Sequence, residues 1–488
     1  MRVLIFLFTL FTLLSYHGQG FYKLYSGPGF DKGESVIQLP DSSYVLTGSS
    51  GSFADNNQAF LLAVDKSGNY NWSKSYGGAE SDLGSRVLQV PNNGLLIAGF
   101  SNSYGQGDFD AFLIKTDLDG NEQWVKNYTV SNHWEKINDA VLTADSGVVM
   151  VGEIMPTSNG NSDVYVIRTD KNGDTLWTKR YGTNGLDAAQ SILSADNGAF
   201  YIAGEWFNSD SSLTKAFLIK IDQNGDTMWH KFYGNMSGRY GFMDITMGTN
   251  LIYGVGYRKI NDSNFDHYIT KIDLNGNLLY EFTMLDDNIF KSEIFDEIIF
   301  LSNSNRVALG YRERSSDTFQ DDFDNKTCYL GASDFIWLNQ SKSINNEGLD
   351  EVGQPLPTND GAYIMIGTNT SIGLSSFTEN GGSNIYLLKV GANDIFPNTS
   401  TVVNTNPLVQ TLGLESKRLN FYPNPVDNYL TVESDRNFEY TIVNSNGLLI
   451  KSGSYNILDK HIDLQNLETG IYFLQIETLH IFCKLIKN

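Results

Sequence analysis

The hydrophobic positions of this chain fall into short runs, and Gly, Asn, Asp and Ser separate one run from the next. Residues 86–89, 95–99, 111–117 and 122–128 illustrate the pattern, because each has the length and the alternation that are typical of a β-strand. No long amphipathic helix is evident in the sequence. The pattern predicts an all-β protein whose strands come in groups of four.

Three markers repeat along the first 390 residues. An Asp-x-x-Gly segment followed by an aromatic residue recurs every 51 to 53 residues, beginning at Asp65, Asp117, Asp170, Asp222 and Asp273. An apolar run that ends in Gly occurs seven times, at Gly48, Gly99, Gly152, Gly204, Gly256, Gly310 and Gly367. An alternating run like 111–117 also occurs seven times, beginning at Ala59, Ala111, Val164, Ala216, His267, Thr327 and Ile385. Four short antiparallel strands in a repeat of about 50 residues indicate a β-propeller blade.

The fourth strand of the repeat determines how the array ends. It begins with an aromatic residue, as at Trp72, and the seventh unit stops at Val390 without one. Residues 21–26, Phe-Tyr-Lys-Leu-Tyr-Ser, match the missing strand and precede the first unit. We therefore expect residues 21–390 to form a seven-bladed β-propeller in which the N-terminal strand completes the last blade and removes an exposed sheet edge.

The repeated polar and aromatic residues have structural interpretations. The Gly of each Asp-x-x-Gly segment is fourth, whereas a calcium-binding EF-hand loop has its Gly sixth, so these segments are predicted to be hairpin turns. The aromatic residues that begin the fourth strands, such as Trp124 and Trp177, are predicted to pack between blades. The acidic residues that start several units are predicted to hold turns, because an active site needs one asymmetric constellation: Asp31, Asp82, Asp187 and Asp350.

The longer connections between the second and third strands are the expected ligand-binding face. They are dissimilar and lie on one side of the disc, while tight turns occupy the other side. Their aromatic residues are expected to be exposed and are our candidate ligand contacts: Tyr104, Trp206, Phe207 and Phe319. The connection in the sixth unit is acidic between residues 317 and 324, which is compatible with a solvated loop or with a divalent cation site.

Composition and the N-terminus indicate export. The formal net charge of −22 over 488 residues disfavours nucleic acid as a partner, because phosphate binding needs clustered Lys and Arg. Residues 1–20 have the features of a signal peptide, with Arg2, an apolar stretch over 3–14 and small residues at its end. That stretch is too short to span a bilayer comfortably, and no later segment is apolar enough, so we expect no transmembrane segment.

The sequence contains no motif for catalysis, metal binding or a cofactor. Its six His residues are scattered, and there is no His-x-x-x-His pair, Gly-x-Ser-x-Gly elbow or phosphate-binding loop. We therefore expect no cofactor and name no catalytic or metal residue. The Asp-x-x-Gly-x-x-x-Trp unit resembles the docking motif of quinoprotein propellers, but the chain lacks the vicinal Cys pair of many of them. Cys328 and Cys483 lie in different predicted domains, so a disulfide framework is not expected.

The C-terminal segment has a different pattern. Residues 391–417 are rich in Thr, Asn, Ser and Pro and are predicted to be a linker. Residues 418–488 contain about seven short strands, with the spacing of an immunoglobulin-like β-sandwich. They resemble the type A sorting domain of the Bacteroidetes type IX secretion system at Tyr422, Pro423, Asn424, Pro425, Gly447, Gly470 and Lys484.

This resemblance implies a route and a set of partners. A protein with such a tail crosses the outer membrane through the type IX secretion machinery, and a sortase-like peptidase removes the tail. The protein is then released or attached to the cell surface. We expect a non-enzymatic binding or adhesion propeller that contacts a surface glycan or protein. The alternatives are an extracellular polysaccharide hydrolase or lyase with its site in the propeller channel, and a structural scaffold.

Overall fold

The computed structural model of the chain describes residues 20–487 except for 26, 28, 53–55, 92–93, 106–108, 159, 209–212, 236–237, 262–263, 284–291, 302–305, 315–322, 332–341, 345–349, 370–382, 392–399, 404–419, 423–427, 434–437, 445–447, 457–460 and 477–480. The predicted signal peptide lies outside the described residues, apart from Gly20. The chain divides into two compact units, Met1–Gln410 and Thr411–Asn488.

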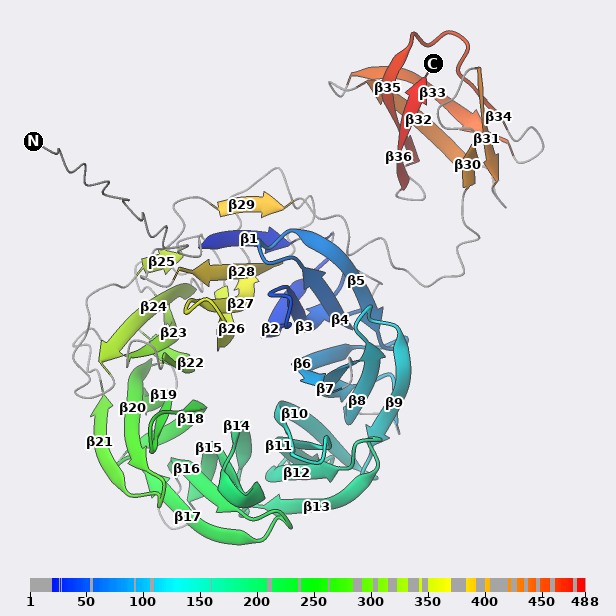
Figure 1. Cartoon of the computed structure of the whole chain (residues 1–488). Helices are drawn as coiled ribbons and strands as arrows, with labels where there is room; N and C mark the ends of the chain where they lie inside the picture. The colour runs from blue at the N-terminus through cyan, green and yellow to red at the C-terminus, as the bar shows by residue number, and fades with distance from the viewer. Residues whose placement is uncertain are drawn as a thin grey trace, which may run out of the picture. The chain divides into compact units, whose positions relative to one another are not determined.

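Six sheets of the first unit are each built from four consecutive antiparallel strands (Figure 1). Three of them comprise β2 (Asp31–Gln38), β3 (Tyr44–Ser50), β4 (Gln58–Val64) and β5 (Tyr70–Tyr76); β6 (Asp82–Val90), β7 (Gly94–Ser101), β8 (Asp110–Asp117) and β9 (Glu122–Tyr128); and β10 (His133–Leu142), β11 (Val148–Pro156), β12 (Asp163–Thr169) and β13 (Thr175–Tyr181). The others comprise β14 (Ala188–Ser194), β15 (Phe200–Asn208), β16 (Leu213–Ile221) and β17 (Thr227–Tyr233); β18 (Arg239–Met247), β19 (Leu251–Asn261), β20 (Asn264–Asp273) and β21 (Leu278–Thr283); and β22 (Ser292–Leu301), β23 (Arg306–Arg314), β24 (Phe323–Gly331) and β25 (Lys342–Ile344). A 3-10 turn, η1 (Asp196–Gly198), lies between β14 and β15.

The remaining sheet of the first unit is a five-stranded composite that uses both ends of the unit. In spatial order it contains β26 (Asp350–Pro357), β27 (Tyr363–Asn369), β28 (Asn384–Val390), β1 (Phe21–Tyr25) and β29 (Ser400–Val403). Strand β1 pairs antiparallel with β28, so that Phe21 lies opposite Lys389 and Tyr25 opposite Ile385. The predicted pairing of the N-terminal strand with residues 385–390 is confirmed.

The sheets surround a central axis, with β2, β6, β10, β14, β18, β22 and β26 as their innermost strands (Figure 1). Strand β26 packs against β22 on one side and β2 on the other, so the composite sheet lies between the first and the last four-stranded blade. The all-β propeller fold is therefore confirmed. The sequence predicted seven four-stranded blades, whereas the structure has six blades of this kind and one five-stranded composite sheet.

The fifth strand of the composite sheet corrects the predicted linker. Strand β29 lies within residues 391–417 and pairs parallel with β1, with Tyr22 opposite Ser400 and Tyr25 opposite Val403. Its sequence, Ser-Thr-Val-Val, is rich in β-branched residues, which favour strands. It covers the edge of β1, whose backbone groups would otherwise lack partners. The sequence pattern missed it because four residues are too few to establish a period of two.

The start predicted for the outermost strand of the sixth four-stranded blade is untested. The strand expected to begin at Trp337 lies outside the described residues, and the fourth strand of this sheet is the three-residue β25. Strand β25 pairs with β24, with Ile344 opposite Asn325. The acidic residues of the preceding connection, between 317 and 322, also lie outside the described residues, so the cation prediction stays a prediction.

The core of the propeller consists of separate clusters, each between two neighbouring sheets. One cluster joins the first two blades and contains Leu61, Val87 and Phe112. The composite sheet contributes to two clusters, because Tyr25 packs with the first blade and Leu24 packs with residues of β22. Burying a large apolar side chain stabilises a protein by about 1.5–3 kcal/mol, so β1 helps to hold both neighbours of the composite sheet.

In the first five blades, the turn between the third and fourth strands docks on the outer strand of the preceding sheet. Asp117 accepts the backbone N–H groups of Asp119 and Asn121 at 3.0 and 2.8 Å, and Gly120 has a φ of 73°. A Cβ at Gly120 would lie 2.6 Å from the Trp72 ring, so only Gly allows this approach. The turn prediction is confirmed, and the Trp residues pack between blades as predicted.

A tyrosine near the end of the fourth strand completes this contact. Tyr76 donates its hydroxyl hydrogen to the Gly120 carbonyl at 2.7 Å. The same bond recurs around the ring, from Tyr128 to Gly173 at 2.8 Å, from Tyr181 to Gly225 at 2.5 Å and from Tyr233 to Gly276 at 3.0 Å. In the composite sheet Tyr25 of β1 donates to Gly68 at 2.8 Å. The N-terminal strand therefore takes the place of a fourth strand.

In its described residues, the second unit contains seven strands in two sheets. One sheet has the order β30 (Asn420–Tyr422), β31 (Tyr429–Glu433) and β34 (His461–Asp463). The other has the order β33 (Leu449–Tyr455), β32 (Phe438–Asn444), β35 (Gly470–Ile476) and β36 (Ile481–Lys487). Leu430, Ile442, Ile462 and Leu474 are buried, as expected for two sheets that share a core.

Replacing Tyr25 by Phe removes the hydroxyl that bonds Gly68 and keeps the buried ring. We expect the free energy of unfolding to fall by about 1 kcal/mol, the usual net contribution of such a hydrogen bond. Tyr128→Phe removes the equivalent bond between the second and third blades and is the matched control. Chemical denaturation of both variants measures the effect. An unchanged stability for Tyr25→Phe together with a loss for Tyr128→Phe would contradict a structural role for β1.

Candidate functional site

Each inner strand contains a β-bulge at the same place. The pairing with the second strand skips one residue between Gly33 and Ser35 in β2, and the same shift occurs in β6, β10, β14, β18 and β22. In β26 two residues are skipped, between Val352 and Pro355. A bulge bends its strand and redirects the side chain of the extra residue. In the six four-stranded blades these extra residues are Glu34, Ser85, Asn138, Gln190, Met243 and Asp296.

The Gly that ends each apolar run lies opposite the residue before the bulge. Gly48 pairs with Gly33, and Gly99 pairs with Gly84. A Cβ at Gly48 would lie 1.9 Å from the carbonyl oxygen of Lys32, and one at Gly99 would lie 1.9 Å from that of Leu83. Because the bulge brings the two backbones this close, a side chain is excluded. The bulge therefore accounts for the most regular glycine marker in the sequence.

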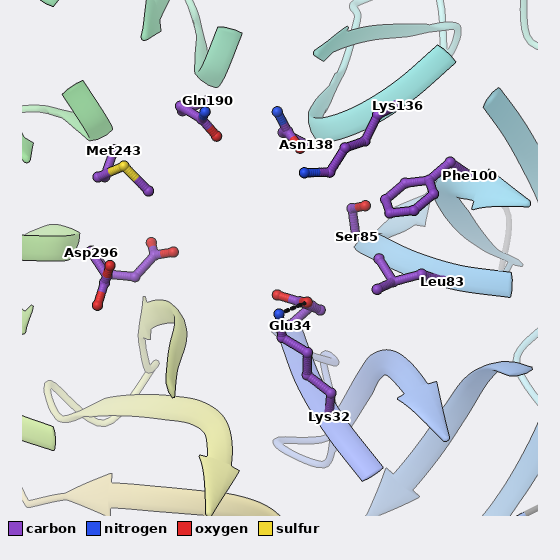
Figure 2. A pocket seen from close by; sticks show the side chains of 11 residues that line it. Lys32, Glu34, Leu83, Ser85, Phe100, Lys136, Asn138, Gln190, Met243 and Asp296 are labelled. Atoms are coloured by element: carbon purple, nitrogen blue, oxygen red, sulfur yellow. Dashed lines mark ion pairs between the residues drawn. The ribbon is translucent and has the colours of Figure 1, made fainter. Parts of the chain in front are cut away.

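The six extra residues line a cavity of about 370 Å³ in the middle of the ring. Figure 2 shows Lys32, Leu83, Phe100 and Lys136 beside them, with their side chains around the same space. The inner strands start at the connections between blades, as β6 does at Asp82. The residues that line the cavity lie near these starts. The cavity is therefore at that end of the channel where the long connections between the second and third strands also lie.

The cavity contains charges of both signs together with amides and apolar groups. Lys32 Nζ lies 2.9 Å from Glu34 Oε1, and Lys136 Nζ lies 4.0 Å from Glu153 Oε1 and 5.9 Å from the centre of the Phe100 ring. Asn138 donates from Nδ2 to the carbonyl of Ala189 in the next blade at 2.8 Å. Such a lining offers donors and acceptors in fixed places beside apolar surface, as small-molecule sites do.

A belt of hydrogen bonds lies directly behind these cavity residues. The side chain of the residue after the bulge accepts a backbone N–H from the next blade. Ser35 accepts from Val87 at 3.4 Å, Asp139 from Ile192 at 2.9 Å, Ser191 from Ile245 at 3.4 Å and Asp244 from Ile298 at 3.0 Å. These donors lie on the innermost strand, whose free edge leaves backbone N–H groups without a ladder partner, and the belt supplies acceptors for them. The belt therefore joins adjacent blades and holds the cavity residues in place.

The carboxyl groups of the belt are buried and electrostatically coupled. Burial raises the pKa of Asp139, while Arg86 lies 3.4 Å away and opposes the shift. Burial also raises the pKa of Asp244 to about 6 and raises that of Glu297 well above its ordinary value. Asp244 and Glu297 are hydrogen-bonded, and the charge of Asp244 adds to the burial that raises the pKa of Glu297. Their partners indicate a structural role.

Replacing Asp139 by Ala removes the acceptor of Ile192 N–H and leaves Arg86 without its partner. We expect a loss of about 3 kcal/mol in the free energy of unfolding, because breaking a buried pair leaves an uncompensated charge. Ser35→Ala, which removes one neutral acceptor at the equivalent position, should cost about 1 kcal/mol. Denaturant titration distinguishes the two, and equal effects would show that Asp139 acts only as one more acceptor.

The acidic residues that start the units hold the connections between blades, as predicted. Asp31 is buried and accepts the backbone N–H of Gly27 at 3.0 Å and the hydroxyls of Ser50 and Ser52 at 2.5 and 2.8 Å. Asp187 accepts the N–H groups of Thr183 and Phe207 at 2.5 and 2.6 Å. Asp82 likewise accepts the N–H of Gly78 at 2.9 Å. The side chain of Asp350 lies outside the described residues.

Glu135 occupies this position in the third blade and differs from the aspartates. It is fully buried, and burial raises its pKa to about 8, with a further increase from the nearby charge of Asp110. Between its ordinary value of 4.5 and about 8, the folded protein keeps a proton that the unfolded chain has lost. Raising the pH through this window therefore lowers stability, and the loss is complete above about pH 8.

Glu135→Gln should flatten this pH dependence, because the amide cannot ionise. We expect the melting temperature of the variant at pH 8.5 to exceed that of the unmodified protein by roughly 1–3 °C, with a smaller difference at pH 4.5. Differential scanning calorimetry at both pH values measures it. Glu122→Gln, on the exposed start of β9, is the control. A difference that is equal at both pH values would contradict the ionisation of Glu135 as its cause.

The candidate ligand contacts from the sequence do not come together at the cavity. Trp206 is 8% exposed and packs on Phe217 and His230 at 5.4 and 4.3 Å between ring centres, so its predicted exposure is wrong. Phe207 is half-buried, and its backbone N–H bonds Asp187. Tyr104 is half-buried too, and burial raises its pKa to about 12. Phe319 lies outside the described residues.

Sequence analysis missed the residues at the bulges. They recur every 51 to 53 residues and five of the six are polar, which is a signal that alignment of the units could have found. Among the residues that the structure describes, no group of three or more His, Cys, Asp and Glu is placed to hold a metal ion.

The structure also places the sorting motif of the second unit. Tyr422 lies in β30 opposite Thr431, Gly470 begins β35 and Lys484 lies in β36 opposite Phe473. Pro423, Asn424, Pro425 and Gly447 lie outside the described residues. The central hairpin is present, because Asn444 and Leu448 exchange hydrogen bonds of 3.0 Å between β32 and β33.

Comparison with known proteins supports this assignment of the tail. Residues 420–487 match the family model of the secretion system C-terminal sorting domain. No curated protein matches the chain in sequence.

Solved structures similar to the chain are distant. They include Sqt1 from Chaetomium thermophilum, with 14% identity, a TM-score of 0.42 and coverage of 71% of this chain and 81% of that one. The periplasmic gluconolactonase PpgL from Pseudomonas aeruginosa has 11% identity, a TM-score of 0.44 and coverage of 66% and 89%. At this distance neither structure supports a function for the chain.

The tail determines where the protein goes. Type IX secretion delivers proteins that carry this domain out of the cell. Within the described part of the chain, no helix has the length and apolar character needed to cross a membrane. In the sequence, a β-propeller is followed by a C-terminal sorting domain of the type IX secretion system, and the chain is a secreted or cell-surface protein.

Proposed function

We propose that the propeller is a non-enzymatic binding protein that holds an extracellular glycan at the loop-facing end of its central channel. The observation that carries this proposal is the repeated bulge, which places six dissimilar side chains from six successive blades around one cavity. A repeat that served only packing would be expected to carry similar residues at this position. Their divergence, on a regular and rigid scaffold, is typical of a binding site.

The composite sheet acts as a seventh blade and completes the ring. This closure supports the proposed function. Its strand β1 bonds the first blade through Tyr25 and packs on β22 residues through Leu24. A closed ring holds the inner strands at fixed separations, so the cavity is formed before the ligand arrives. Preorganisation of this kind reduces the entropy that is lost on binding.

The carboxylates of the cavity are already engaged within the protein. Glu34 forms an ion pair with Lys32, and Glu297 is hydrogen-bonded to Asp244. Among the residues that the structure describes, those that line the cavity include neither His nor Tyr. A general acid and base pair needs two groups with different pKa values that both reach the substrate. The engagement of Glu34 and Glu297 therefore favours binding over catalysis.

A polysaccharide hydrolase or lyase is the second candidate. It is favoured by the presence of Glu34, Asp296 and Glu297 in one cavity, because hydrolysis of glycosidic bonds uses a pair of carboxyl groups. In either case the type IX machinery would export the chain, and a sortase-like peptidase would remove its tail before release or surface attachment.

Met243→Trp should block the cavity, because the Met243 side chain points into it (Figure 2). Binding is measured on a panel of immobilised polysaccharides that includes β-glucan and chitin. For each polysaccharide that the unmodified protein binds, we expect the variant to bind at least tenfold more weakly. Met228→Trp makes the same change on the outermost strand β17, where Met228 is 57% exposed, and should bind normally.

The same panel separates binding from catalysis. The double variant Glu34→Gln and Asp296→Asn should still retain the polysaccharide, and no new reducing ends or unsaturated sugars should appear with either protein. Product release that this double variant abolishes would favour the second candidate. Equal binding by Met243→Trp and Met228→Trp, or no retention of any polysaccharide by the unmodified protein, would overturn the proposed function.

A further inference from the structure

An aromatic cluster extends from the cavity to the surface at the junction of the second and third blades. Phe100 lines the cavity, its ring centre lies 5.3 Å from that of Phe109, and Phe109 lies 6.1 Å from Trp134. Both contacts are edge to face, with interplanar angles of 83° and 82°. Trp134 at the outer end of the cluster is 41% exposed. This exposure leaves part of the Trp134 ring available for contact with a ligand.

The strand that carries Trp134 also carries cavity residues. Exposed or half-buried residues alternate with buried ones along β10, so that Trp134, Lys136 and Asn138 share one face and Glu135, Ile137 and Asp139 share the other. The shared face therefore runs from the surface into the channel. The Glu135 backbone N–H bonds the Phe109 carbonyl at 2.7 Å and holds the loop residue against the strand.

The other blades carry different residues at the position that is equivalent to Trp134. The residue that precedes the acidic start of the unit is Phe30 in the first blade, Ser81 in the second and Leu186 in the fourth. Phe30 and Leu186 are 62% and 58% exposed, so this end of the propeller has several apolar side chains in water. Within the described residues, the cluster of rings that reaches the cavity is the one that ends at Trp134.

The charges in the cavity indicate an uncharged ligand. Lys32 is neutralised by Glu34, Lys136 is near Glu153, and Glu297 is hydrogen-bonded to Asp244. The formal net charge of −22 further disfavours polyanions. A hydroxyl donates one hydrogen bond and accepts two, so a polyhydroxylated ligand can satisfy both amides and carboxylates.

On the basis of the proposed function, we infer that Phe100, Phe109 and Trp134 form an aromatic platform that binds the second and later units of an uncharged oligosaccharide whose terminal unit occupies the channel. The apolar C–H face of a sugar ring can pack on an aromatic ring, while its hydroxyls remain in water. The platform adds contact area only for ligands longer than the cavity, so it determines the dependence of affinity on chain length.

Isothermal titration calorimetry with cello-oligosaccharides and chitin oligosaccharides from the disaccharide to the hexasaccharide tests this inference. For the unmodified protein we expect affinity to increase with chain length in at least one series. Trp134→Ala should weaken hexasaccharide binding about tenfold and leave disaccharide binding unchanged. Trp134→Tyr should restore most of the affinity. Leu186→Ala, a change at the equivalent exposed position of the fourth blade, should have no effect.

The outcomes separate this inference from the proposed function. If Met243→Trp abolishes binding but Trp134→Ala keeps the full dependence on chain length, the platform is wrong and the channel site stands. Tighter binding of oligogalacturonate than of the uncharged series would overturn the assignment of an uncharged ligand. If the unmodified protein binds none of the three series, both proposals fail.

Discussion

The β-bulge in the inner strands is the constraint on which the rest of the propeller depends. The extra residue shifts the register, so the Gly opposite must approach a carbonyl oxygen too closely for any side chain. Backbone N–H groups that follow the bulge on the innermost strand bond the neighbouring blade. One local irregularity therefore requires a glycine, joins adjacent blades and directs a side chain into the channel.

The ring is held together at two radii by different interactions. Near the axis, the belt of Ser35, Asp139, Ser191 and Asp244 accepts backbone N–H groups across blade boundaries. At the outer strands, tyrosine hydroxyls and tryptophan rings dock on the left-handed glycine turns. The N-terminal strand takes part in the outer set through Tyr25, so the circle closes with the same contact that joins consecutive blades.

Under the proposed function, stability and ligand binding use different residues of the same strands. In β10, Asp139 and Glu135 face the packed interior, whereas Trp134, Lys136 and Asn138 face the channel and its mouth. Because the bulge supplies the channel residue and the belt residue follows it, the lining can vary from blade to blade without loss of the inter-blade bonds. This separation explains how a regular repeat can display six different side chains at equivalent positions.

The sequence by itself determined the all-β repeat, the pairing of residues 21–25 with 385–389, the tight turns and the sorting tail, because periodicity and turn chemistry are local properties. It missed β29, which is too short to show a period, and it expected Trp206 to be exposed although packing buries it. Only the tertiary structure decided which side chains meet. A bulge is a shift in the register between two strands, and the cavity is lined by residues from six blades. Neither feature can be read from one continuous segment of the sequence.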